Sequence, residues 1–303
     1  MDNLTHSLVG ALLGQAGLKR KTGLAMPALI IGANLPDVDA ACFLWLDGTQ
    51  HLAFRRGITH GPPAWLLLPL VLAGLLYGFD RWQAKRGARP AARLPVRFGW
   101  LYGLSLFGCL THPALDWLNV YGIRLLMPFS DRWFYGDILF IIDIWLWLLM
   151  GAATWISLRR EKRGKEWCKP ARVALAATLA YIGVQSAITW QAERTPGDAP
   201  TGAQIVIASP PPAVSIDRDM ITGGNGLYAV NGEVLPGVPL ERCDLATART
   251  SSKDVGAFLV WSRTPLVELR EDGSQWLRDA RFYDPRVGDR FSAKLPAGTC
   301  DTF

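Results

Sequence analysis

The five cysteines of this sequence form no C-x-x-C pair and have no zinc-finger spacing, which excludes the common cysteine-based zinc and redox motifs. Histidine is also scarce, with four residues in 303 and none after His112. The N-terminus has no basic segment, and its first apolar run, residues 8–18, contains glycine and glutamine. We therefore expect no cleavable signal peptide.

The sequence contains 32 lysines and arginines against 26 aspartates and glutamates, which gives a net charge of +6. The basic residues cluster in short segments between apolar runs. This distribution is typical of membrane proteins, where basic loops set the orientation, and not of a nucleic-acid-binding face. We expect no nucleic-acid partner.

Half of the residues are hydrophobic, but they are unevenly distributed. Residues 1–192 contain long apolar runs, whereas residues 193–303 have the polarity of a soluble domain, so we expect two domains with these bounds. A spanning helix needs about 20 apolar residues. Five segments approach this length: Leu24–Leu46, Pro62–Phe79, Phe98–Leu118, Ile138–Leu158 and Ala171–Trp190.

The first of these segments is interrupted by the stretch NLPDVD, and the N-terminal run Thr5–Leu18 is too short for a complete span. The sequence therefore predicts a mainly α, polytopic helical membrane bundle. It has about five spanning helices and a short N-terminal helix, followed by a small β-rich soluble domain.

Three basic loops, at 19–21, 81–97 and 159–172, are separated by two predicted spans each. The alternate loops, 47–61 and 119–135, carry two basic residues each. By the positive-inside rule, we expect the basic loops in the cytoplasm and both the N-terminus and the C-terminal domain outside.

Residues 193–303 begin with the linker ERTPGDAP, and short apolar stretches such as AQIVIAS and GAFLVWS follow between turn residues. This pattern predicts strands, and hence a β-rich domain. Cys243 and Cys300 can form a disulfide if the domain lies outside the cytoplasm. Two unpaired buried cysteines are the alternative, because sequence does not give their separation.

Ionisable residues gather at one level of the predicted bundle. On this topology, five segments present histidines and aspartates at their outer ends: His6, Asp37, Asp39, His60, His112, Asp116, Asp137 and Asp143. Random placement would scatter them over both levels. Ionisable side chains at membrane depth are costly and generally functional, so we expect them to form one site.

Imidazole and carboxylate together suit zinc, with manganese as the alternative at carboxylate-rich sites. His112 and Asp116 are four residues apart and share one helix face. Pro36 breaks the helix near Asp37 and Asp39, and at Pro113 the helix can kink or start. Such irregularity is tolerated in a membrane where it lines a protein-enclosed cavity.

Each residue also has a simpler interpretation. His6 can be an interfacial residue, and Asp37 or Asp137 can cap a helix. Asp143 lies too deep in its segment for a cap, whereas His51 lies among polar loop residues. Arg56 can lie at the interface or, four residues before His60, face the site and bind an anionic group.

Five stretches, in this order and spacing over roughly residues 1–155, resemble a known family: THSLVG, NLPDVD, RRGITH, HPALDWLNVYG and GDILFIIDIWLW. They are similar to the LexA-regulated inner-membrane metal-dependent hydrolases, the YdjM-like family. The stretch WSRTPLVELREDGSQWLRDARFYDPR resembles the extension of longer members. The resemblance implies a multi-pass protein of the bacterial inner membrane, and on our topology its site and C-terminal domain face the periplasm.

That family is distantly similar to the zinc-dependent phospholipase C and P1 nuclease group. Carried over by position, the similarity implies the metal ligands His6, Asp37 or Asp39, His60, His112 and Asp116. The chain lacks that group's later histidine cluster, so we expect one or two ions. We do not expect the terminal amine, a ligand in that group, to serve here.

The reaction that follows is hydrolysis of an ester or phosphoester by metal-activated water. Arg56 would stabilise charge on the reacting oxygens, and Asp39 or Asp143 would act as general base. The outer position of the site indicates a lipid or lipid-linked substrate, with membrane lipid as the partner.

Two other functions stay open. An ion- or proton-coupled transporter would place such groups nearer the midplane and often shows inverted repeats. A non-catalytic, metal-stabilised membrane protein would have closed coordination, with no position for water.

Overall fold

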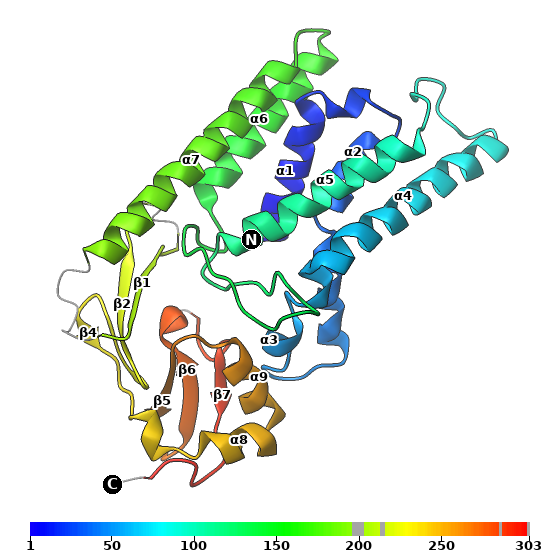
Figure 1. Cartoon of the computed structure of the whole chain (residues 1–303). Helices are drawn as coiled ribbons and strands as arrows, with labels where there is room; N and C mark the ends of the chain where they lie inside the picture. Colours follow the sequence, from blue (N-terminus) through cyan, green and yellow to red (C-terminus); the bar gives the residue numbers. More distant parts are fainter. Residues whose placement is uncertain (196–202, 213–215, 285–286, 302–303) are drawn as a thin grey trace. The chain divides into compact units, whose positions relative to one another are not determined.

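The computed structural model describes residues 1–195, 203–212, 216–284 and 287–301 (Figure 1). The chain divides into two compact units. One comprises Met1–Val38 and Arg56–Ser186, and the other Asp39–Arg55 and Ala187–Phe303. Residues 39–55 thus group with the C-terminal part of the chain.

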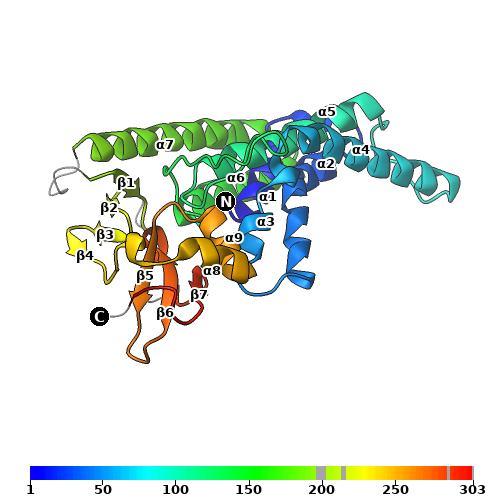
Figure 2. The ribbon, with the colours of Figure 1, turned by 60° about the horizontal axis from the view of Figure 1, so that its bottom comes forward.

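The first unit is helical (Figures 1 and 2). Its helices are α1 (Asn3–Gln15), α2 (Ala25–Gly32), α4 (Pro62–Lys85), α5 (Phe98–Trp117), α6 (Ile144–Lys162) and most of α7 (Cys168–Arg194). Short 3-10 helices cover Leu18–Arg20 and Ile58–His60. A buried core that includes Leu12, Leu29, Leu101 and Met150 joins these helices.

Glycines bring α2 close to α1 and α5. A Cβ atom on Gly10 or Gly108 would lie 2.7 Å from the carbonyl oxygen of Leu29, and one on Gly32 would lie 2.8 Å from that of Ser105. Only glycine permits backbones to approach so closely. α5 continues through Pro113 to Trp117, so the proline does not start the helix.

Among the described residues, α4 and α7 are long and apolar enough to cross a membrane. The bent pair Ala25–Gly32 and Leu35–Leu44 would make a third span if it counts as one. Five spans are not confirmed. The apolar stretch of α5 is shortened because His112 and Asp116 lie near its end. The apolar stretch of α6 is shortened because the helix starts six residues after the expected Ile138 and ends in charged residues.

The second unit contains two antiparallel sheets. Strands β1 (Ile205–Ser209), β2 (Asp219–Gly224), β3 (Leu227–Val230) and β4 (Glu233–Val234) pair in that order. Strands β5 (Pro265–Leu269), β6 (Gln275–Asp279) and β7 (Ser292–Lys294) form the other sheet. The helices of this unit include α3 (His51–Phe54), α8 (Leu245–Ser251) and α9 (Lys253–Trp261), with 3-10 turns at Leu240–Arg242 and Ala280–Phe282.

The antiparallel C-terminal region is confirmed, and the stretch AQIVIAS contains β1. The strand predicted from GAFLVWS is wrong, because these residues belong to α9. Ser252 caps this helix by accepting a hydrogen bond from the Val255 amide. Phe258 and Trp261, three residues apart, are fully buried on one face, and this helical spacing cannot be recognised in a short, wholly apolar run.

Cys243 and Cys300 form a disulfide, which decides between the two alternatives for this pair. Cys42, Cys109 and Cys168 are buried free thiols.

Candidate metal centre

Four segments of the first unit bring histidines and aspartates together. His6 lies on α1, Asp37 follows α2, His60 ends the 3-10 turn before α4, and His112 and Asp116 lie in the last turns of α5. Their ligand atoms form two groups, His6–Asp37–His112 and His60–His112–Asp116, each within 4.8 Å. All but Asp37 are fully buried. Asp37, and not Asp39, is therefore the aspartate of NLPDVD that joins these groups.

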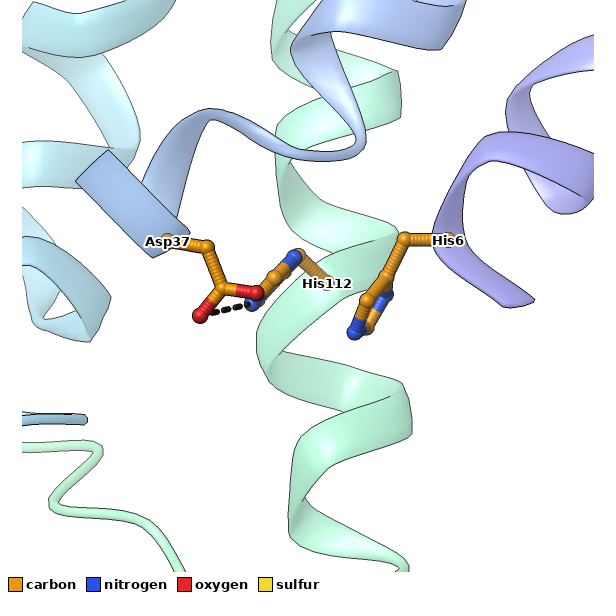
Figure 3. A group of neighbouring side chains, drawn as sticks. All are labelled: His6, Asp37 and His112. Atoms are coloured by element: carbon orange, nitrogen blue, oxygen red, sulfur yellow. Dashed lines mark ion pairs between the residues drawn. The ribbon is translucent and has the colours of Figure 1, made fainter. Parts of the chain in front are cut away.

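His112 belongs to both groups, and Figure 3 shows it between His6 and Asp37 of the first group. Its Nδ1 donates a hydrogen bond to the carbonyl oxygen of Ala33 at 2.7 Å. Nε2 therefore carries the lone pair and faces the other ligands. It lies 3.2 Å from Nε2 of His60, 3.5 Å from Asp116 Oδ2 and 3.8 Å from Asp37 Oδ1.

The other two imidazoles present nitrogen atoms to the same space. Nδ1 of His60 lies 2.9 Å from the Thr59 hydroxyl, which leaves Nε2 facing His112. The His6 ring stacks on His112 with centroids 3.7 Å apart, and its Nε2 is 3.4 Å from Asp116 Oδ1. Within the described residues, neither ring nitrogen of His6 has a hydrogen-bond partner. Buried polar atoms without a partner are rare in proteins, and a bound ion would satisfy one of the two.

Arg56 contacts the centre through Asp116. Its Nε lies 3.0 Å from Asp116 Oδ2, and its Nη1 donates to Asn119 Oδ1 at 2.9 Å and to the Gly122 carbonyl at 3.1 Å. Arg56 has a left-handed backbone with φ 52°, unusual for a non-glycine residue. The buried guanidinium of Arg56 is thus oriented toward Asp116.

Two contacts of Asp116 and Arg56 were not expected from the sequence. The terminal nitrogen of Met1 contacts Asp116 Oδ1. From the sequence, we had not expected this amine to take part in the site. Asn119 is fully buried and orients Arg56. Its only signal in the sequence is its place three residues after Asp116, within the stretch HPALDWLNVYG.

Three predicted residues lie outside the two ligand groups. Asp143 is the N-cap of α6, where its carboxylate accepts from the Leu146 amide at 3.0 Å and the Tyr181 hydroxyl at 2.8 Å. The expectation that Asp143 lies too deep to cap is therefore wrong, because the helix starts at Ile144. Asp39 pairs with Arg55 at 3.4 Å within the second unit. Asp137 is buried and lies six residues before Asp143, the residue that caps α6, so Asp137 does not cap that helix.

The residues of the centre fit a divalent metal ion. Three imidazoles and a carboxylate are common zinc ligands, and two of the imidazoles are oriented through their second nitrogen, as metal-bound histidines generally are. Asp37 adds a second carboxylate to the set.

Comparison with known proteins agrees with a membrane assignment. The chain is 24% identical to a protein of Bacillus subtilis (strain 168), described as uncharacterized protein YfhP, over 94% of this chain and 86% of the relative. No solved structure matches the chain. Residues 1–192 match the family described as YdjM inner membrane protein. Because this match covers nearly two thirds of the sequence, the chain belongs to the YdjM inner membrane protein family.

Proposed function

We propose that this chain is a membrane-bound, metal-dependent hydrolase that cleaves an ester or phosphoester of a lipid or lipid-linked molecule. The observation that carries this proposal is the 3.2 Å approach of the Nε2 atoms of His60 and His112. A carboxylate oxygen of Asp116 lies 3.5–3.6 Å from both nitrogens. Two imidazoles and a carboxylate held at such distances around one point favour a bound cation.

His6, Asp37, His60, His112 and Asp116 would hold one or two ions, with zinc favoured over manganese by the imidazole-rich set. Such an ion supplies Lewis acidity and activates water near neutral pH. Arg56 and Asn119 position the Asp116 carboxylate, and Arg56 places a positive charge where anionic oxygens of a substrate would bind. The carboxylate of Asp143 is occupied as a helix cap, and Asp39 belongs to the second unit.

A distant similarity to the zinc-dependent phospholipase C and P1 nuclease group, which we infer from the sequence motifs alone, would place the chain in the same reaction class. The membrane family supports a lipid substrate. We further propose about five spans, with the site and the C-terminal unit on the periplasmic side. The Cys243–Cys300 disulfide supports this orientation, because disulfides persist outside the cytoplasm.

A non-catalytic, metal-stabilised protein is the second candidate. The complete burial of His6, His60, His112 and Asp116 favours it, since structural metal sites are closed to solvent. The two candidates differ in whether water and substrate reach the centre.

The test is an assay of the full chain in detergent or nanodiscs against a panel of phosphodiester and carboxylic ester lipids. We expect hydrolysis that falls in His112→Ala and Asp116→Ala by more than the roughly 100-fold typical of losing an outer-shell partner. His51→Ala, a histidine outside both ligand groups, keeps its activity. A protein that holds metal yet hydrolyses no member of the panel would favour the structural role.

A further inference from the structure

A groove of about 520 Å³ lies between α6 and α7. Its walls are apolar and include three alanines, Ala152 and Ala153 of α6 and Ala174 of α7, whose short side chains leave the space open. Ile156 and Val173 complete the walls near one end. The volume falls within the roughly 300–1,000 Å³ range of small-molecule sites.

One end of the groove is cationic. Arg160, one turn beyond Ile156, and Lys169, in the first turn of α7, both line it and are exposed. Arg160 Nε donates to the backbone carbonyl of Glu166 at 2.5 Å, which fixes the guanidinium at the mouth. The Glu166 carboxylate is occupied in capping the backbone amides of Cys168 and Lys169.

The surroundings place this end at the headgroup level of a membrane. Arg159 stacks over Trp155 at 4.0 Å, and Lys19 lies over Trp167 at 4.2 Å. Tryptophan and snorkelling basic residues are enriched at membrane interfaces. Residues 159–172 contain seven basic and two acidic residues, a density that attracts anionic lipid.

The length of the groove matches one leaflet. Leu149 and Arg160 both line it, and at 1.5 Å per helical residue they are about 16 Å apart along α6. This is close to half of the roughly 30 Å hydrocarbon core of a bilayer. Apolar side chains beside it, such as Leu148 and Leu179, are 60% and 71% exposed, as expected for a surface that faces lipid.

We propose that this groove binds an anionic phospholipid, with its phosphate on Arg160 and Lys169 and an acyl chain between α6 and α7. The site lies outside the two groups of candidate metal ligands, so the inference does not depend on hydrolysis. A zwitterionic lipid with the same chains would lack the net negative charge that the mouth selects.

The experiment is native mass spectrometry of the full chain in detergent, titrated with phosphatidylglycerol or with phosphatidylcholine of identical acyl chains. The test variant is Arg160→Gln/Lys169→Gln. Its matched control, Arg163→Gln/Lys165→Gln, removes the same charge from the same loop outside the groove. A further variant, Ala152→Phe, fills the groove from its exposed side without changing charge.

We expect phosphatidylglycerol to bind wild type more tightly than phosphatidylcholine. The affinity should fall about tenfold or more in the test variant, since each basic residue near the surface contributes substantially to anionic-lipid binding. Ala152→Phe should lose lipid of both kinds, whereas the control should change less than about threefold. Equal losses in the test and control variants, or undiminished binding by the filled groove, would overturn the proposal. Size-exclusion profiles identify any variant that has not folded.

Discussion

His112 is the residue on which the candidate centre most depends, because both ligand groups include it. Its orientation comes from a backbone carbonyl, that of Ala33, which no side-chain substitution removes. His60 is oriented instead by the Thr59 hydroxyl. The group that orients His60 can therefore be removed by substitution, whereas the group that orients His112 cannot.

Thr59→Val keeps the shape of the side chain and removes the hydroxyl beside His60 Nδ1. We expect metal affinity to fall about 10–100-fold, the usual effect of losing an outer-shell partner. The measurement is a competitive zinc titration against a chelator. Thr111→Val is the control, since in the described part of the chain the Thr111 hydroxyl bonds to its own helix, at the Gly108 carbonyl; an equal loss there would contradict the assigned role of Thr59.

Asp279 of the second unit is a buried carboxylate that pairs with Arg281. Burial alone would raise its pKa, but Arg281 and the hydroxyls of Ser262 and Thr264 lower the pKa well below its usual value. The folded-state pKa is depressed, so its stabilisation is fully present above the unfolded pKa of about 3.9 and is lost as pH falls toward the folded pKa.

Asp279→Asn removes the charge that compensates buried Arg281. We expect the variant to lose about 3–5 kcal/mol at pH 7, with the difference from wild type shrinking below pH 4. Thermal unfolding of the full chain between pH 7 and pH 3 measures this. Asp289→Asn, at a half-exposed ion pair, should cost no more than about 1 kcal/mol; a comparable cost at both sites would contradict the assignment.

At the scale of elements, the contact between α2 and α5 holds His112 against Ala33. Gly108→Ala would drive a Cβ atom to 2.7 Å from the Leu29 carbonyl and push the helices apart. We expect a destabilisation of about 1–3 kcal/mol, together with weaker metal binding. Gly103→Ala on the same helix meets no atom within 4 Å.

Because alanine favours helix over glycine by about 1 kcal/mol, Gly103→Ala should leave the protein as stable as wild type or more so. Thermal unfolding and zinc titration of both variants give the comparison. Equal stability and equal zinc affinity in the two variants would mean that the close contact between α2 and α5 does not position the metal centre.

The sequence predicted the helical part, the C-terminal sheets and the gathering of His6, Asp37, His60, His112 and Asp116. These follow from apolar runs and from the cost of ionisable groups at membrane depth. It could not separate Asp37 from Asp39, because both lie in one irregular turn. It also misplaced the start of α6, and with it the role of Asp143, since an apolar stretch continues before the helix begins. The contact of His112 with the Ala33 carbonyl could not be predicted either, because a backbone carbonyl has no side chain that marks it in the sequence.

At the scale of the whole molecule, the proposed orientation puts the second unit in an oxidising compartment. We expect Cys243 and Cys300 to resist a maleimide reagent in protein unfolded without reductant, whereas Cys42, Cys109 and Cys168 all react. Mass spectrometry of the labelled chain counts the adducts, with reduced protein as the control. Five adducts without reduction, from protein made in its native membrane, would contradict the disulfide and the orientation that it supports.

The central claim is that His6, Asp37, His60, His112 and Asp116 hold metal. The most direct measurement is the metal content of detergent-purified wild type by mass spectrometry, beside His112→Ala, His6→Ala, His60→Ala and the control His51→Ala. We expect one or two zinc or manganese ions in wild type and in His51→Ala, with the greatest loss in His112→Ala because His112 serves both groups. A well-folded wild type that binds no metal after reconstitution, or a His112→Ala variant that keeps its full content, would contradict it.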